Sequence, residues 1–211
     1  MKLCLDTRGA SDKLYAIKIM DKTVLKKKRQ GMSNMLQSVQ KEIAIMKKLS
    51  HPNCVRLHEV IDDPSSNKLY LRLEFVTGGQ CMPSENGTEP LPLDVAQRHF
   101  SDLISGLEYL HVNHVLHRDI KPENLLVCKE TGVLKLADFG VSQTLEGSGG
   151  PGGGPEEMIS KSAGTPAFMA PECCVPGAFH GKLADIWAAG VSLYFFVHGR
   201  CPFVSPNVMQ V

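Results

Sequence analysis

The stretch "HVLHRDIKPENLLV" at residues 114–127 decides how the rest of the chain is interpreted. It places an Asp, a Lys and an Asn between two apolar patches, Val115–Leu116 and Leu125–Val127. Burial of the apolar neighbours draws these polar groups toward the interior, which costs free energy unless the groups are paired or used. The stretch therefore predicts a polar site held at the edge of a hydrophobic core.

The composition is that of a soluble globular protein, with 211 residues, 43% hydrophobic and 21% charged, enough for one large domain or two small lobes. A net charge of +1 gives no general electrostatic reason to bind nucleic acid. The longest apolar run, "IWAAGVSLYFFV" at 186–197, suits a buried core helix and is too short to cross a bilayer. We expect neither nucleic acid nor a membrane as a partner.

The seven cysteines have no CxxC spacing, which indicates reduced thiols rather than a disulfide framework. The N-terminal "MKLCLDTRGA" lacks the apolar stretch of a signal peptide. These features predict a cytoplasmic protein, with the nucleus as a second location.

The first part of the chain is rich in predicted strands. Apolar and β-branched runs between turn residues predict strands at 2–6, 13–20, 54–61 and 68–76. Apolar residues spaced by three and four predict an amphipathic helix at 35–49. The basic connector at 21–34 is interpreted as a solvated loop.

The composition changes at Thr77, where a linker rich in turn residues begins. A long helix is predicted at 93–114, followed by a short apolar strand that runs into Asp138-Phe139-Gly140. The Gly-rich run at 146–157 cannot bury a core and is expected to be disordered. A strand-rich front and a helix-rich back predict an α+β fold.

Several residues together match the requirements of phosphoryl transfer, which needs a cation, metal ligands and an orienting carboxylate. They are Lys18 in "YAIK", Glu42 on the predicted helix, Asp119 and Asn124 in "HRDIKPEN", Asp138, and the closing Ala170-Pro171-Glu172. Each alone is a weak signal, but their order and spacing have no simpler explanation. Asp119 would orient a substrate hydroxyl and Lys121 would steady the γ-phosphate of ATP. Asn124 and Asp138 would hold Mg²⁺.

With these motifs the chain resembles the eukaryotic protein kinases from residue 1 to residue 211. The resemblance implies a two-lobed fold with ATP in the cleft between the lobes. A small antiparallel-sheet N-lobe with one helix would span 1–76, a hinge and linker 77–93, and a mainly helical C-lobe 94–211.

The same resemblance assigns further residues. "LEFV" at 73–76 is similar to the hinge, with Leu73 as gatekeeper and the backbones of Glu74 and Val76 facing adenine. The remaining nucleotide-binding positions are Ala16, Lys18, Glu42, Glu123 and Leu126. Lys121 and Thr165 are typical of serine/threonine kinases. Met46, His117 and Phe139 match the hydrophobic spine, which Asp185 anchors.

"LHEVIDDPSSNKLYLRLEFV", "DFGVSQTLEG" and "AGTPAFMAPECC" resemble more narrowly the calcium/calmodulin-dependent protein kinase kinases. They are also similar to the plant and algal relatives that activate kinases of the AMP-activated/sucrose-non-fermenting type. This implies protein substrates that are themselves kinases, and calmodulin as a partner through a segment beyond residue 211.

The family's Gly-rich phosphate loop would precede residue 1 and its last helices would follow residue 211, so we expect a chain truncated at both ends. This leaves two hypotheses. One is an active serine/threonine kinase, which the intact Lys18, Glu42, Asp119, Asn124 and Asp138 favour. The other is an impaired fragment or pseudokinase that acts as a protein-interaction module.

Overall fold

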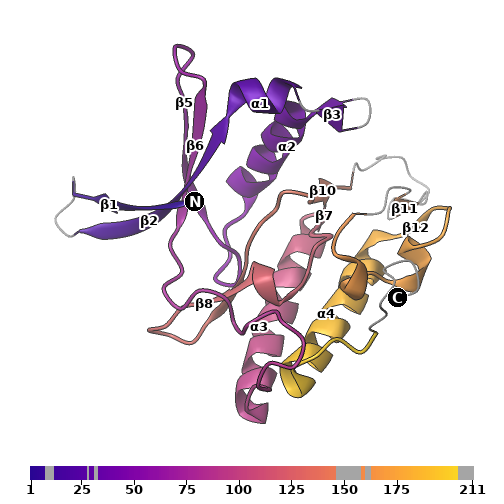
Figure 1. The fold of residues 1–211 in the computed structure, drawn as a ribbon. Coiled ribbons are helices and arrows are strands. Elements are labelled where there is room, and N and C mark those ends of the chain that lie inside the picture. The colour runs from indigo at the N-terminus through magenta and orange to yellow at the C-terminus, as the bar shows by residue number, and fades with distance from the viewer. Residues whose placement is uncertain (8–11, 28, 31–32, 146–157, 160–162, 204–211) are drawn as a thin grey trace.

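The computed structural model describes residues 1–7, 12–27, 29–30, 33–145, 158–159 and 163–203. A four-stranded antiparallel sheet in the order β1-β2-β6-β5 forms one part, and two long helices dominate the other (Figure 1). The Gly-rich run expected to be disordered, 146–157, lies outside the described residues. The arrangement confirms the predicted α+β fold with a sheet-based N-lobe and a helical C-lobe.

The predicted strands and helix of the sheet-containing part occur in the expected order, and α1, β3 and β4 are added within the connector 21–34. In chain order the elements are β1 (Lys2–Asp6), β2 (Lys13–Asp21), α1 (Lys22–Lys27), β3 (Arg29–Gln30), β4 (Ser33–Asn34), α2 (Met35–Lys48), β5 (Leu57–Asp62) and β6 (Lys68–Glu74). In the pairing of β2 with β6, Ala16 lies opposite Leu73 and Tyr15 lies opposite Glu74. Successive side chains point to opposite faces of a strand, so these two pairs lie on opposite faces of the sheet.

The basic connector is not only a loop, as the sequence had indicated, because residues 22–27 form the short helix α1. The Asp21 carboxylate accepts hydrogen bonds from the amides of Thr23 and Val24 at 2.9 and 3.3 Å, which caps the helix N-terminus. Leu25 is only 8% exposed and joins the core. The N-lobe therefore has one helix more than predicted.

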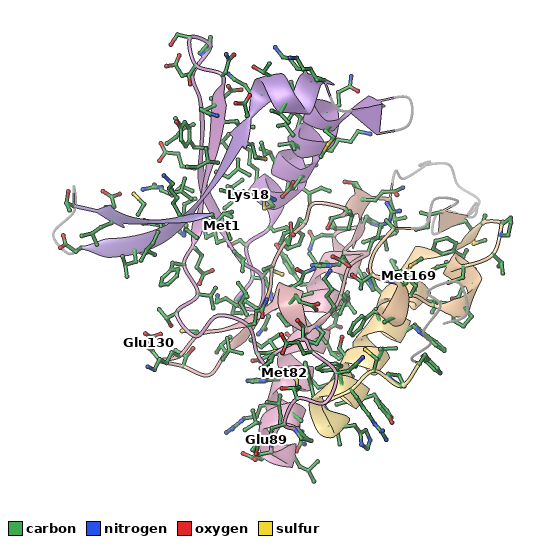
Figure 2. The ribbon with its side chains drawn as sticks, viewed as in Figure 1. Met1, Lys18, Met82, Glu89, Glu130 and Met169 are labelled. Carbon is green, nitrogen blue, oxygen red and sulfur yellow. The ribbon has the colours of Figure 1, made fainter. Side chains whose placement is uncertain are left out.

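The C-lobe is built from α3 (Leu93–Val112) and α4 (Gly181–His198), which pack against each other (Figure 1). Its short strands are β7 (Val115–Leu116), β8 (Leu125–Val127), β9 (Leu134–Leu136), β10 (Gln143–Thr144), β11 (Met158–Ile159) and β12 (Phe179–His180). Short 3-10 helices span Pro122–Asn124, Pro166–Phe168 and Pro171–Cys173. The linker descends beside α3, past Met82 and Glu89 (Figure 2).

Helix α4 is buried on one side only, although its apolar sequence predicts burial all round. Phe195 and Phe196 are fully buried, whereas Leu183 and Ile186 are 58% and 48% exposed.

Among the described residues, no helix is both long and apolar enough to span a membrane.

Replacement of Leu103 on α3 by Ala should lower the free energy of unfolding by about 2–5 kcal/mol, because its side chain is fully buried and the change leaves a cavity. Leu93→Ala on the same helix is the matched control, since Leu93 is 72% exposed and its loss should cost less than about 0.5 kcal/mol. Urea unfolding of the two variants measures the difference. Equal losses would contradict the packing described for α3.

Candidate active site

The loop after β7 is fixed at both ends by apolar burial. Leu116, Ile120 and Leu125 are at most 1% exposed, so the polar residues between them have little freedom to move. Arg118 lies in the left-handed region of backbone conformation, with φ of 70°. That conformation costs free energy for a residue other than glycine and persists only where the surroundings enforce it.

Asp185 of α4 supplies this enforcement. Its carboxylate is 2% exposed and accepts hydrogen bonds from the backbone amides of His117 at 3.0 Å and Arg118 at 2.8 Å. The His111 ring nitrogen lies 2.9 Å from the same carboxylate. A buried carboxylate with this many partners holds the loop backbone in one conformation. His111 was not predicted from the sequence, because only the packing of α3 on α4 brings it there.

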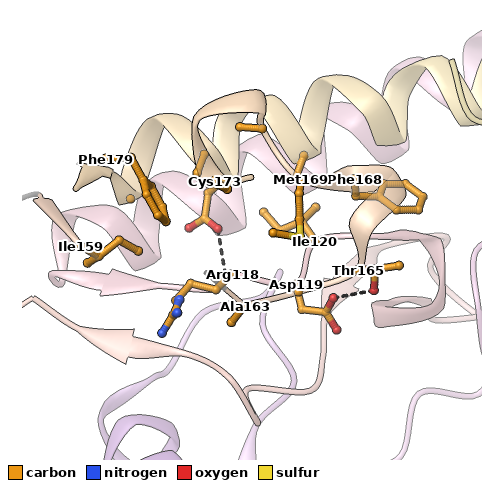
Figure 3. Close-up of a pocket in the computed structure, with 16 residues that line it drawn as sticks. Arg118, Asp119, Ile120, Ile159, Ala163, Thr165, Phe168, Met169, Cys173 and Phe179 are labelled. Carbon is orange, nitrogen blue, oxygen red and sulfur yellow. Dashed lines mark hydrogen bonds between the residues drawn. The ribbon is translucent and has the colours of Figure 1, made fainter. Parts of the chain in front are cut away.

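The other three predicted catalytic residues, Lys121, Asn124 and Thr165, converge on Asp119. Asn124 donates its amide to the Asp119 carboxylate at 2.9 Å, and the Lys121 ammonium lies 3.1 Å from it. The Thr165 hydroxyl donates to Asp119 at 2.9 Å and accepts from Lys121 at 2.7 Å. Figure 3 shows Thr165 pointing at Asp119. These contacts fix the Asp119 carboxylate in position. The hydroxyl of a substrate could take the place of the Thr165 hydroxyl as its hydrogen-bond donor.

Gly164 allows this close approach. Its φ is +117°, and a Cβ atom there would lie 2.5 Å from the carbonyl oxygen of Arg118. The backbone at Gly164 therefore packs directly against the backbone of the loop at Arg118. Residues of both segments surround a cavity of about 30 Å³ that Ile120 and Phe179 help to line (Figure 3). The sequence signal was the glycine of "AGT", which we did not single out.

The predicted cation and its partner meet in the sheet-containing lobe. The Lys18 ammonium on β2 lies 2.9 Å from the Glu42 carboxylate of α2 and 3.5 Å from that of Asp138. Burial alone would lower the pKa of Lys18, but the charges and hydrogen bonds of Glu42 and Asp138 outweigh it, so the pKa lies above its ordinary value. Lys18 is therefore fully charged at neutral pH and suited to hold phosphate oxygens.

Asp138 has a left-handed backbone conformation and its carboxylate faces Lys18. The φ angle of Asp138 is 61° and its side chain is exposed. The side chain of the next residue, Phe139, is buried in the core and only 1% exposed. The Phe139 ring lies 5.4 Å from the ring of His117, and Met46 belongs to the same core, as the spine assignment implied. The amide of Ala137 donates to the carbonyl of Asn124 at 2.8 Å, which ties the two predicted metal ligands together.

Two unpaired polar groups fit a nucleotide. Within the described residues no hydrogen bond engages the Val76 amide, although Val76 is 6% exposed, and such an amide needs an acceptor. The Glu123 carboxylate has a buried oxygen without a partner, which a ribose hydroxyl could satisfy. Ala16 and Leu73 are cross-strand neighbours on the face that carries Lys18. Leu126 is partly buried against the same core.

The predicted role of Glu74 concerns its backbone, and its side chain is used elsewhere. The carboxylate pairs with Lys135 at 2.9 Å on the opposite face of the sheet from Leu73. Among the described residues, no three His, Cys, Asp or Glu side chains form a ready metal site. Asn124 and Asp138 would therefore need nucleotide oxygens to complete the coordination of Mg²⁺.

The chain is similar in sequence to proteins of one known family. The family described as "Protein kinase domain" matches residues 3–211. The calcium/calmodulin-dependent protein kinase kinase of Caenorhabditis elegans is 47% identical over 94% of this chain and 39% of its own length. Serine/threonine-protein kinase ssp1 of Schizosaccharomyces pombe is 43% identical over 96% of this chain and 31% of its own length. Serine/threonine-protein kinase GRIK1 of Arabidopsis thaliana is 40% identical over 99% of this chain and 51% of its own length. The chain thus spans about half or less of these relatives.

The buried ring of His117 predicts a loss of stability in acid. Burial lowers the pKa of His117, so the folded protein keeps it neutral while the unfolded chain takes up a proton below about pH 6.5. The free energy of unfolding should fall as the pH drops below that value, by at most about 1.4 kcal/mol per pH unit for this one group. Urea unfolding across this range measures the slope.

His117→Phe should reduce the slope, although the variant also loses hydrogen bonds and is less stable at every pH. His198→Phe, at an exposed position, is the matched control. A slope unchanged by His117→Phe would show that the acid sensitivity has another source.

Proposed function

Because the chain belongs to the protein kinase family, we propose that it transfers the γ-phosphate of ATP to serine or threonine hydroxyls of protein substrates. The observation that carries the proposal is that one structure contains both groups of residues that phosphoryl transfer needs, the phosphate-binding cation with its partner and the residues around the catalytic carboxylate. Lys18 is paired with Glu42 on one side of the cleft, and Asp119, Lys121 and Asn124 are joined on the other.

The proposed mechanism assigns one task to each residue. ATP would supply the phosphoryl group and Mg²⁺ would neutralise its charge, with Asn124 and Asp138 as ligands. Asp119 orients the incoming hydroxyl and accepts its proton. Lys121, which now donates to Thr165, would move its hydrogen bond to the phosphoryl oxygens. The loop backbone is already held by Asp185, so the rearrangement before the reaction is that Thr165 leaves Asp119 and Lys121 changes partner.

The narrower proposal is that the substrates are other kinases, phosphorylated on their activation segments. It is supported by the similarity to a protein named as a kinase kinase, and by the motifs that resemble that group. Calmodulin remains a proposed partner on the same grounds. A cytoplasmic location, with the nucleus as the alternative, remains a prediction.

The direct test of the general proposal is Asp119→Asn. Phosphate transfer from labelled ATP to a protein substrate should fall at least about a hundredfold, which corresponds to about 2.7 kcal/mol of activation free energy. Nucleotide affinity, measured by calorimetry, should change less than about threefold, because Asp119 acts on the hydroxyl and not on the nucleotide.

Asp94→Asn, an exposed carboxylate on α3, is the matched control and should behave like the unchanged chain. Transfer that survives Asp119→Asn would exclude this residue as the proton acceptor. Nucleotide binding without any transfer in the unchanged chain would favour the interaction-module alternative. A kinase whose activation-segment threonine is replaced by alanine tests the narrower proposal, since it should not be labelled.

A further inference from the structure

A second concave surface lies on the face of the sheet opposite the Lys18 side. It is a groove of about 460 Å³ lined by parts of β2, the α2–β5 connection, the start of β5, the end of β6 and β9. Tyr15 and Glu74, which pair across β2 and β6, belong to it, whereas their neighbours Ala16 and Leu73 lie on the opposite face. The groove is therefore distinct from the proposed nucleotide site and is lined by residues of both lobes.

The groove carries an excess of positive charge. Its lining holds the cationic side chains of Lys13, Arg56 and Lys135 against one carboxylate, that of Glu74. The Glu74 carboxylate is already occupied, because it pairs with Lys135 at 2.9 Å and accepts the backbone amide of Arg56 at 3.3 Å. Since the whole chain has a net charge of only +1, this local excess is not a consequence of composition.

Lys13 and Arg56 differ from Lys18, Lys68 and Arg72 on β2 and β6. Lys18, Lys68 and Arg72, on β2 and β6, each pair with a carboxylate at 2.9, 2.7 and 2.8 Å. Both Lys13 and the Arg56 guanidinium are exposed, and within the described residues neither has a carboxylate partner. Lys13 lies only over the ring of Tyr15, at 5.6 Å. The two unpaired cations are available to an anionic ligand.

The floor of the groove is aromatic. The ring of Tyr15 is 8% exposed and meets the ring of His58 edge-on at 5.0 Å. Burial, with the charges of Lys13, Arg56 and Arg72, lowers the pKa of His58, and only Glu74 opposes this. The histidine is thus neutral at neutral pH and contributes an uncharged, ring-lined surface between the cations.

We propose that this groove is a docking site for an acidic segment of a protein partner. Carboxylates of the segment would pair with Lys13 and Arg56, and its apolar side chains would lie against the partly exposed ring of His58, which packs on the buried Tyr15. A nucleic acid is disfavoured, because the groove has few cations for a ligand bound mainly through phosphate contacts. A segment bound here would contact both lobes beside the hinge.

The probe is a short fluorescein-labelled peptide of alternating glutamate and leucine, titrated by fluorescence anisotropy at low ionic strength. Saturable binding to the unchanged chain is expected, and Lys13→Glu/Arg56→Glu should weaken it at least about tenfold. The matched control is Lys41→Glu/Lys129→Glu, which makes the same change in net charge at exposed lysines outside the groove and should stay within about twofold.

The same peptide with glutamine in place of glutamate should not bind. Equal weakening by both double variants, or equal binding of both peptides, would overturn the proposal. So would tighter, groove-dependent binding of a single-stranded oligothymidylate. Lys13→Gln/Arg56→Gln gives the same test should charge reversal impair folding, with retained binding counting against the site. Hydrogen exchange with the peptide bound should protect residues 50–58, and protection confined elsewhere would contradict the location.

Discussion

The buried carboxylate of Asp185 is the constraint on which the candidate active site depends. It accepts two consecutive backbone amides, those of His117 and Arg118, and so holds Arg118 in a conformation that it would not adopt freely. Asp119, Asn124 and Lys121 follow within the same loop, and their geometry depends on that backbone. These hydrogen bonds offset the free-energy cost of burying the Asp185 carboxylate on α4. They also hold the loop in the conformation that the proposed reaction needs.

The two sides of the cleft are assembled by different physical means. On the sheet side, strand register places Lys18 on the face toward α2, where Glu42 completes a short ion pair. On the helical side, apolar burial at Leu116, Ile120 and Leu125 fixes the ends of a polar loop. The same strand alternation that aims Lys18 at the cleft puts Tyr15 and Glu74 on the opposite face, where they line the basic groove. A single sheet thus supports two separate surfaces.

The sequence predicted most of this architecture because the strands and helices follow simple hydrophobic periods and the motif residues keep a fixed order. Helix α1 escaped prediction, because its polar composition masks the Asp21 cap and the buried Leu25. Hydropathy alone does not show which face of α4 finds a neighbour, and the structure leaves Leu183 and Ile186 exposed. The hydrogen bonds from Thr165 to Asp119 and from His111 to Asp185 join distant segments, and no local pattern encodes them.

The most direct test of the central claim compares Asp185→Ala with the unchanged chain by hydrogen exchange of the His117 and Arg118 amides. If the carboxylate holds the loop, both amides should exchange slowly in the unchanged chain and at least about tenfold faster in the variant. Amides of the sheet, such as that of Leu71 on β6, should keep their protection because they do not depend on Asp185. Unchanged protection of His117 and Arg118 in the folded variant would contradict the account.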